Sequence, residues 1–173
     1  MTAIVDGSLG FTAPVGAVYN GLQTGTAVAS TSGTSITFTG IPSWAKRISV
    51  MFNQVSGSGS SNYLVRIGSG SVQSTGYLSA SAYVNTTSSL NCTLDTTGFA
   101  IFNGNSSNKI SGIMTIDNLS GNLWVASHSV GDADAAKMGG GTVTLSGILD
   151  RVVITFTNGT DTFDLGSINI IYE

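Results

Sequence analysis

Apolar residues recur at every second position through most of this chain. Ile36 and Phe38 alternate with Ser and Thr, and Ile48, Val50 and Phe52 alternate with residues such as Arg and Asn. Successive side chains of a β-strand point to opposite faces, so this period of two predicts strands with one face in a core. The same alternation occurs in residues 63–67, 114–116, 123–125, 143–145, 152–156 and 168–172.

Clusters of Gly, Ser and Asn separate the alternating stretches. Residues 57–62, 103–108 and 139–141 are such clusters, and we interpret them as loops because Gly and Asn tolerate positive φ. Only residues 132–138 could form a helical turn or two, and strands do not alternate with helices. About ten short strands predict an all-β fold, an antiparallel β-sandwich of jelly-roll-like type.

The first 25 residues differ from the rest. Residues 5–25 are interrupted by Gly and show little alternation, so we expect residues 1–25 to be an N-terminal arm or linker. Residues 26–173 are then a single β-sandwich domain. Apolar residues make up 41% of the chain, which is enough for a packed core of this size.

Residue types that carry most enzyme chemistry are scarce. The chain has one His, one Cys and one Glu, and only 9% of its residues are charged. Most proton transfer, nucleophilic attack and metal ligation use His, Cys, Glu, Asp and Lys. We therefore expect a protein that is not an enzyme, and that has no cofactor and no metal site.

Charge and hydropathy also restrict the partners. The six Lys and Arg residues are dispersed, so nucleic acid is not an expected partner. No apolar run approaches the roughly 20 residues of a membrane span, and the first residues lack the features of a secretory signal. Neutral hydroxyls and amides suit sugars or protein surfaces, although Ser and Thr are also ordinary outward-facing strand residues.

Two blocks of sequence carry a family resemblance. They are TSITFTGIPSWAKRISVMF, residues 34–52, and LDRVVITFTNGTDTFDLGSINIIYE, residues 149–173. Both resemble the C-terminal domain of bacteriophage and prophage tail fibre or tail-associated proteins. The resemblance extends over about residues 26–173, is weaker in residues 56–145, and includes no catalytic signature.

The resemblance implies a distal, trimeric, host-recognising β-domain. Its expected partners are a bacterial surface glycan or receptor, two further copies of itself in a homotrimer, and upstream tail fibre segments. Its expected location is the virion, in the phage tail. Because residues 56–145 match less well, the resemblance assigns no binding residue.

The pattern of residues 123–129 predicts one candidate binding surface. In an extended strand Trp124, Ala126 and His128 share one face, and Leu123 and Val125 occupy the other. We place Leu123 and Val125 on the core face, which makes Trp124 and His128 an outward-facing ligand platform. The alternative is that Trp124 packs in the core or against a trimer neighbour.

Other aromatic and acidic residues are weaker candidates. Tyr77 and Tyr83 share a face if the chain between them is extended, and either sugar stacking or ordinary cross-strand packing would explain them. Asp132 and Asp134 form an Asp-x-Asp pair, but calcium takes six to eight oxygen ligands, so a solvated loop is favoured. Trp44 is expected to fill a core or interface position before a strand.

Three functions remain open at this level. The first is attachment of a phage tail fibre or spike to the bacterial surface. The second is a purely structural trimerisation or capping domain, suggested by apolar residues such as Ile113, Val153 and Ile171 on expected outer faces. The third is the carbohydrate-binding part of a depolymerase, although no pair of the eight Asp and single Glu has a spacing that indicates a glycosidase.

Overall fold

The protein is all-β in the part of the chain that the structure describes. The structure is a computed structural model and describes residues 4–6, 10–12 and 21–173. These residues form antiparallel strands and no helix. Strands β1 (Ile4–Asp6) and β2 (Gly10–Thr12) pair only with each other.

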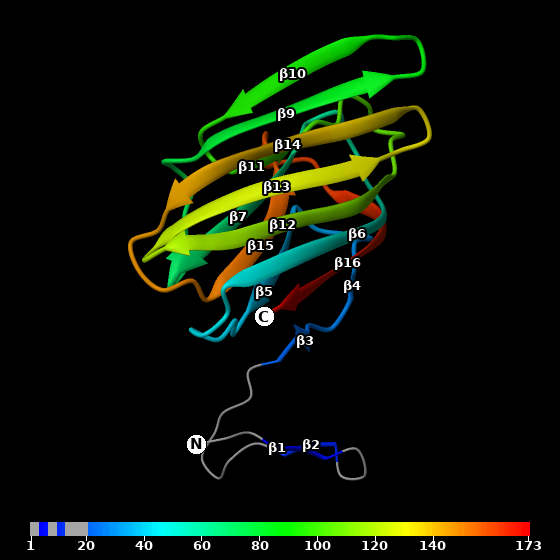
Figure 1. Cartoon of the computed structure of the whole chain (residues 1–173). Coiled ribbons are helices and arrows are strands. Elements are labelled where there is room, and N and C mark those ends of the chain that lie inside the picture. The colour runs from blue at the N-terminus through cyan, green and yellow to red at the C-terminus, as the bar shows by residue number, and fades with distance from the viewer. Residues whose placement is uncertain (1–3, 7–9, 13–20) are drawn as a thin grey trace.

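The larger sheet has nine strands and forms one layer (Figure 1). From its free edge the order is β10 (Leu90–Asp95), β9 (Leu78–Asn85), β14 (Ala135–Thr144), β13 (Leu123–Gly131), β12 (Ile110–Ser120), β6 (Arg47–Gly57), β16 (Phe163–Tyr172) and β3 (Gln23–Thr24). The short strand β4 (Val28–Ala29) also pairs with β16.

The smaller sheet has five strands and lies behind the first layer (Figure 1). Its order is β11 (Phe99–Ile101), β7 (Tyr63–Ser69), β15 (Arg151–Phe156) and β5 (Ser35–Thr39), and β8 (Ser71–Val72) pairs with β7.

The two sheets enclose one hydrophobic core, as the alternation predicts. The larger sheet contributes Ile48, Val50, Phe52, Met114, Ile116, Trp124, Val130, Val143, Ile168 and Ile170, and the smaller contributes Ile36, Phe38, Tyr63, Val65, Ile67, Phe99, Ile101, Val152, Ile154 and Phe156. In β5 the buried residues are Ile36 and Phe38, and in β6 they include Ile48, Val50 and Phe52, the apolar members of the pattern. Ser56 and Gly57, near the end of β6, are buried as well. The prediction of antiparallel, half-buried strands is confirmed.

The two sequence blocks of the family resemblance lie side by side in this fold. Strand β5 pairs with β15 in the smaller sheet, and β6 pairs with β16 in the larger one. Arg47 joins them further: its Nη1 lies 2.8 Å from Glu173 Oε1, and its backbone N–H donates to the Glu173 carbonyl. Trp44 packs against the core and against Tyr172, with 5.8 Å between ring centroids.

Two local predictions are wrong. The segment expected to form a helical turn, residues 132–138, is a tight turn that leads into strand β14. The glycines 139–141, expected in a loop, lie inside the same strand and pair with both β9 and β13. These positions require glycine, because the space beside them is filled. A Cβ on Gly139 would collide with the Ala80 carbonyl and lie 2.5 Å from His128 Cε1.

The N-terminal arm is described only in part. Residues 1–3, 7–9 and 13–20 lie outside the described residues. At the end of the predicted arm, Gln23 and Thr24 form β3 and pair with Tyr172 and Ile171 of β16.

The close packing at Gly139 predicts a difference between two glycines. Gly139→Ala should lower the free energy of unfolding by about 1–3 kcal/mol, because the new methyl group meets backbone that cannot move aside cheaply. Gly131→Ala is the matched control, since its Cβ would meet only the Ala135 carbonyl, at 3.5 Å. Urea unfolding measures both, and equal stability of the two variants would contradict the close approach of β14 and β9.

Candidate functional site

Trp124 and His128 face the core, so the predicted outward platform is wrong. Their exposed fractions are 4% and 5%, whereas Leu123 and Val125 are only half-buried on the opposite face. Both faces of β13 carry apolar residues, so the alternation alone does not show which face is buried. The strands that pair with β13 determine this. Trp124 pairs with the buried Val143 of β14, and His128 pairs with the buried Met114 of β12.

His128 is held inside the fold as a neutral side chain. Its Nε2 lies 3.1 Å from Ser81 Oγ, and its Nδ1 has no hydrogen-bond partner among the described residues. Burial lowers the pKa of His128 to about 4, because an apolar surrounding disfavours the charged imidazolium. A buried neutral histidine of this kind is a structural residue and does not present itself to an external ligand.

Tyr77 is also buried, with 1% of its surface exposed. Its ring packs edge-on against Phe99 at 5.0 Å, and its hydroxyl accepts a hydrogen bond from the Ile67 N–H at 2.9 Å. Burial raises the pKa of Tyr77 to about 12. Of the two interpretations of Tyr77, ordinary packing is the one that fits this position.

Besides Trp124, which lines a small cavity of about 120 Å³, Tyr83 is the predicted site residue that borders a cavity. It is half-buried in β9, and its ring lies 4.5 Å from that of Phe102, which follows β11. Together the two rings border a recess of about 220 Å³ between β9, β14 and the loop after β11. We call it the polar recess, and its lining includes Tyr83, Phe102, Asn103, Asp132, Asp134 and Lys137.

A buried ion pair forms one side of the polar recess. Lys137 Nζ lies 2.6 Å from Asp132 Oδ2, and the two side chains are 1% and 2% exposed. Asp132 Oδ1 accepts the N–H groups of Asp134 and Ala135 at 2.9 and 2.8 Å. Burial favours the neutral carboxyl, but the hydrogen bonds from Lys137 and from these amides outweigh it and lower the pKa of Asp132. Asp132 is therefore ionised at neutral pH.

The polar recess contains buried hydrogen-bonding capacity that the fold leaves unused. Asn103 is 2% exposed and donates to the carbonyls of Gly59 and Ser61, but its Oδ1 has no partner among the described residues. Lys137 Nζ can donate three hydrogen bonds, and Asp132 is the one acceptor near it among those residues. A buried polar atom without a partner costs about 1–3 kcal/mol, so a polar group of a ligand that reached these atoms would be stabilised there.

A second hollow continues from the polar recess. It has a volume of about 560 Å³ and shares Asn108, Asp132 and Asp134 with the recess. Gln54, Lys109 and Ser111 also line it. The two hollows together present amides, hydroxyls and charges of both signs.

Serine side chains attach the wall of the recess to the larger sheet. Ser79 Oγ accepts the Ala100 N–H at 2.9 Å, and Ser81 Oγ accepts the Phe102 N–H at 3.0 Å. These bonds fix the backbone on which the Phe102 ring is carried. Of the ring pair, Tyr83 is therefore carried by β9, and Phe102 by backbone that is hydrogen-bonded to β9.

Sequence reasoning identified Tyr83 and missed the rest of the polar recess. Asn103 lies in an amide-rich cluster that was interpreted only as a loop, and Lys137 lies in the expected helix. The sequence favours a solvated loop for Asp132 and Asp134, and this is wrong for Asp132, whose side chain is buried against Lys137. The described residues contain no group of three or more His, Cys, Asp or Glu side chains that could hold a metal ion. The one available signal was an aromatic residue, Phe102, directly before the amide cluster.

Comparisons with known proteins add no relative. No family model, no curated protein and no solved structure matches this chain. Within the described residues, no helix has the length and apolar character to cross a membrane.

Burial of His128 predicts a pH dependence of stability. Its pKa is about 4 in the folded state against an ordinary value of 6.5, so the unfolded chain binds the proton more readily. Stability is therefore full above pH 6.5 and is lost progressively as the pH falls towards 4, by up to about 3 kcal/mol. The contribution of Asp132 to stability is lost only at lower pH, below its ordinary pKa of 3.8, because its pKa in the folded state is lowered further.

Urea unfolding between pH 7 and 4.5 tests this assignment. His128→Gln should be less steeply destabilised over this range than the natural protein, whatever its stability at pH 7. A natural protein whose stability stays level from pH 7 to 4.5 would contradict a buried neutral His128.

Proposed function

We propose that this chain is a non-catalytic attachment domain of a phage tail fibre or spike, which binds a bacterial surface glycan in the polar recess. The observation that carries the proposal is the recess itself. It combines an aromatic ring pair with the unpartnered Oδ1 of Asn103 and the buried amine of Lys137.

The chemistry of these groups suits a sugar. Sugar rings have apolar faces that stack on aromatic side chains and hydroxyls that pair with amides and charges. The recess alone is smaller than the roughly 300–1,000 Å³ of most small-molecule sites, but with the adjoining hollow it falls in that range. A partially exposed polar groove of this kind fits one or two sugar units of a longer chain.

The wider context of the proposal comes from the family resemblance. The domain is a jelly-roll-like homotrimer, joined to upstream fibre segments and carried on the virion. Three weak sites on one fibre, and several fibres on one particle, would raise the total affinity by orders of magnitude. A single shallow site is then sufficient.

A purely structural role is the second candidate. It is favoured by large apolar side chains on the outer face of the larger sheet, such as Leu90 and Leu94, each 78% exposed. A structural domain needs such a face for other subunits but has no use for unpartnered polar atoms in a recess. The third candidate, part of a depolymerase, is less favoured, because the Asp132 carboxylate in the recess is engaged by Lys137 and by two backbone N–H groups.

Binding to a panel of bacterial surface polysaccharides tests the proposal. Tyr83→Ala should weaken binding of the recognised glycan about tenfold, because one stacking partner is lost. Tyr172→Ala is the matched control, since Tyr172 is also half-buried and packs on another aromatic ring, Trp44, outside the recess. Thermal unfolding of both variants establishes that they are folded.

Three outcomes of this experiment would contradict parts of the proposal. Absence of binding to any glycan, even at high protein concentration, would overturn the attachment function. Equal binding by Tyr83→Ala would move the site away from the polar recess. Release of reducing ends from a bound polysaccharide would revive the depolymerase.

A further inference from the structure

The outer side of β9, β10 and β14 forms an exposed apolar surface. Its large side chains are Leu78, Val84, Leu90, Cys92, Leu94 and Met138, and we call it the apolar face. Leu78, Leu90 and Leu94 are 72%, 78% and 78% exposed, and Met138 is 54% exposed. Only alanines, glycine and threonine lie between them on these strands, so the face is continuous.

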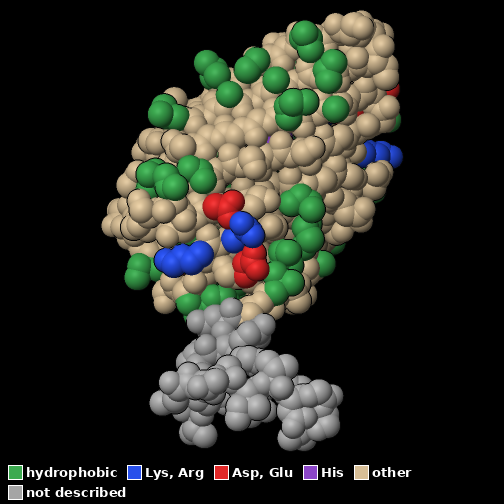
Figure 2. Space-filling view, in the orientation of Figure 1, with side chains coloured by type: hydrophobic (Ala, Val, Ile, Leu, Met, Phe, Trp, Pro, Cys, Tyr) green, Lys and Arg blue, Asp and Glu red, His purple; other side chains and the backbone are tan. Residues whose placement is uncertain are grey.

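The apolar face carries no charge. No outward side chain of β9, β10 or β14 is Asp, Glu, Lys or Arg. The ion pairs of this sheet surface lie at its other end, where Arg47 of β6 contacts Asp117 and Glu173. In Figure 2 a cluster of red and blue side chains lies low in the view, whereas separate groups of apolar side chains stand out among tan groups in the region of β9 and β10.

The apolar face is about half as large as one partner's share of a standard subunit interface. Three strands with their flanks span about 15 Å, and the eight residues of β9 span about 25 Å. A footprint of roughly 400 Å² is within the largest apolar patches of monomers and about half of what one partner buries in a standard interface. Ile113 of β12, 48% exposed on the same side of the sheet, extends it further.

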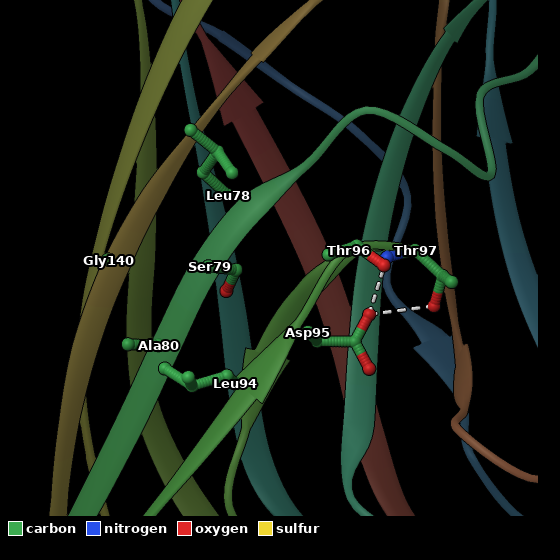
Figure 3. A pocket seen from close by; sticks show the side chains of 8 residues that line it. All are labelled: Leu78, Ser79, Ala80, Leu94, Asp95, Thr96, Thr97 and Gly140. Carbon is green, nitrogen blue, oxygen red and sulfur yellow. Dashed lines mark hydrogen bonds between the residues drawn. The ribbon is translucent and has the colours of Figure 1, made fainter.

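The face contains a socket next to its protruding leucines. A hollow of about 530 Å³ lies between Leu78 and Leu94, with Ala80 and Gly140 beside them. In Figure 3 the two leucines stand on either side of this hollow, and Asp95 is bonded to Thr97. An apolar side chain from outside would meet Leu78, Leu94 and Ala80 there, while Asp95, Thr96 and Thr97 form the polar side of the hollow. The face itself offers such apolar side chains at Leu90 and Met138.

Strand β10 also leaves one edge of its backbone unpaired. The Asn85 N–H donates to the Ser89 carbonyl, and hydrogen-bonded pairs alternate along an antiparallel ladder. Asn91, Thr93 and Asp95 are then the residues that bond to β9. The N–H and C=O groups of Leu90, Cys92 and Leu94 point to the free edge, and the Cys92 N–H contacts only the side chain of its neighbour Asn91, at 2.7 Å.

This edge has little of the protection that edge strands usually have, since its inward-pointing charge lies at the very end of the strand. Exposed edges are normally blocked by charge, proline or a bulge. Strand β10 has neither proline nor a break in register, and its one charged residue, Asp95, points inward and closes the turn to Thr97 and Gly98. A strand of this kind is suited to contact with another polypeptide.

We propose that the apolar face and the free edge of β10 are the surface on which copies of this chain associate with one another. A face without charge meets its own copy without repulsion and leaves no charge buried without a partner. The protruding leucines and the adjacent socket make it complementary to itself. The proposal rests on the self-association part of the proposed function and is independent of the glycan.

Cys92 provides a direct measure of contact on this face. It is a free, exposed cysteine near the middle of β10. Light scattering gives the mass over a range of protein concentrations, and the rate of Cys92 alkylation by a maleimide is measured in the same samples. We expect an oligomer at high concentration in which alkylation slows at least about tenfold, and rapid alkylation on dilution to the monomer.

Two variants test whether the copies associate through this surface or through another one. Leu90→Lys with Leu94→Lys should abolish the oligomer, because the lysines would be buried against their own copies. Leu119→Lys is the control, since Leu119 is 63% exposed at the end of β12 and is not part of the apolar face. Unfolding curves measured on dilute samples show whether the variants are folded.

The outcomes distinguish this proposal from the proposed function. An oligomer with fully reactive Cys92, or one that survives the double lysine variant, overturns the surface but leaves self-association in place. A chain that is monomeric at every concentration overturns both, whether or not the recess binds glycan. Protection of Cys92 in a monomer by added phosphatidylcholine vesicles would assign the face to a lipid surface and overturn the proposal as well.

Discussion

The pairing of the last two strands with β5 and β6 is the interaction on which the rest of the structure depends. Strand β15 completes the smaller sheet between β5 and β7, and β16 extends the larger sheet beyond β6. The final 25 residues therefore supply one strand to each layer. Because the two sheets share a single core, loss of this pairing would expose both inner faces at once.

The same pairing brings together the two sequence blocks, residues 34–52 and 149–173, that lie far apart in the chain. Their apolar residues, such as Ile36, Ile48, Ile154 and Ile170, meet in the core only after the chain between them has folded back. That intervening chain builds β7, β9 and β12–β14 and contains the polar recess. The paired strands β5, β6, β15 and β16 and the candidate site therefore come from different parts of the sequence.

Alternation predicted the strands well where only one face is apolar. In β5 the buried positions are the expected ones. Alternation failed in β13, where Leu123 and Val125 on one face compete with Trp124 and Val130 on the other. Only the neighbours decide that case: Gly139 makes room for the His128 ring, and a single sequence gives no sign that these two residues meet.

The candidate site was predictable to a smaller degree. Tyr83 could be selected as an aromatic residue in a strand, but its contacts with Phe102 and the loop join residues that are about twenty positions apart. Lys137 could not be selected, because a lysine in a strand is normally exposed and this one is buried only through Asp132. The site depends on contacts between loops and strands, which local patterns do not encode.

The serine bonds from β9 to the backbone of Ala100 and Phe102 have a consequence for diversification. They hold the chain in place up to Phe102, and Asn103 ties the next residue to the carbonyls of Gly59 and Ser61. The exposed residues that follow, Gly104 to Ser107, contribute nothing to the core. Substitutions and insertions there would alter the rim of the recess while the strands keep their register, so a change of ligand would require few other changes in the domain.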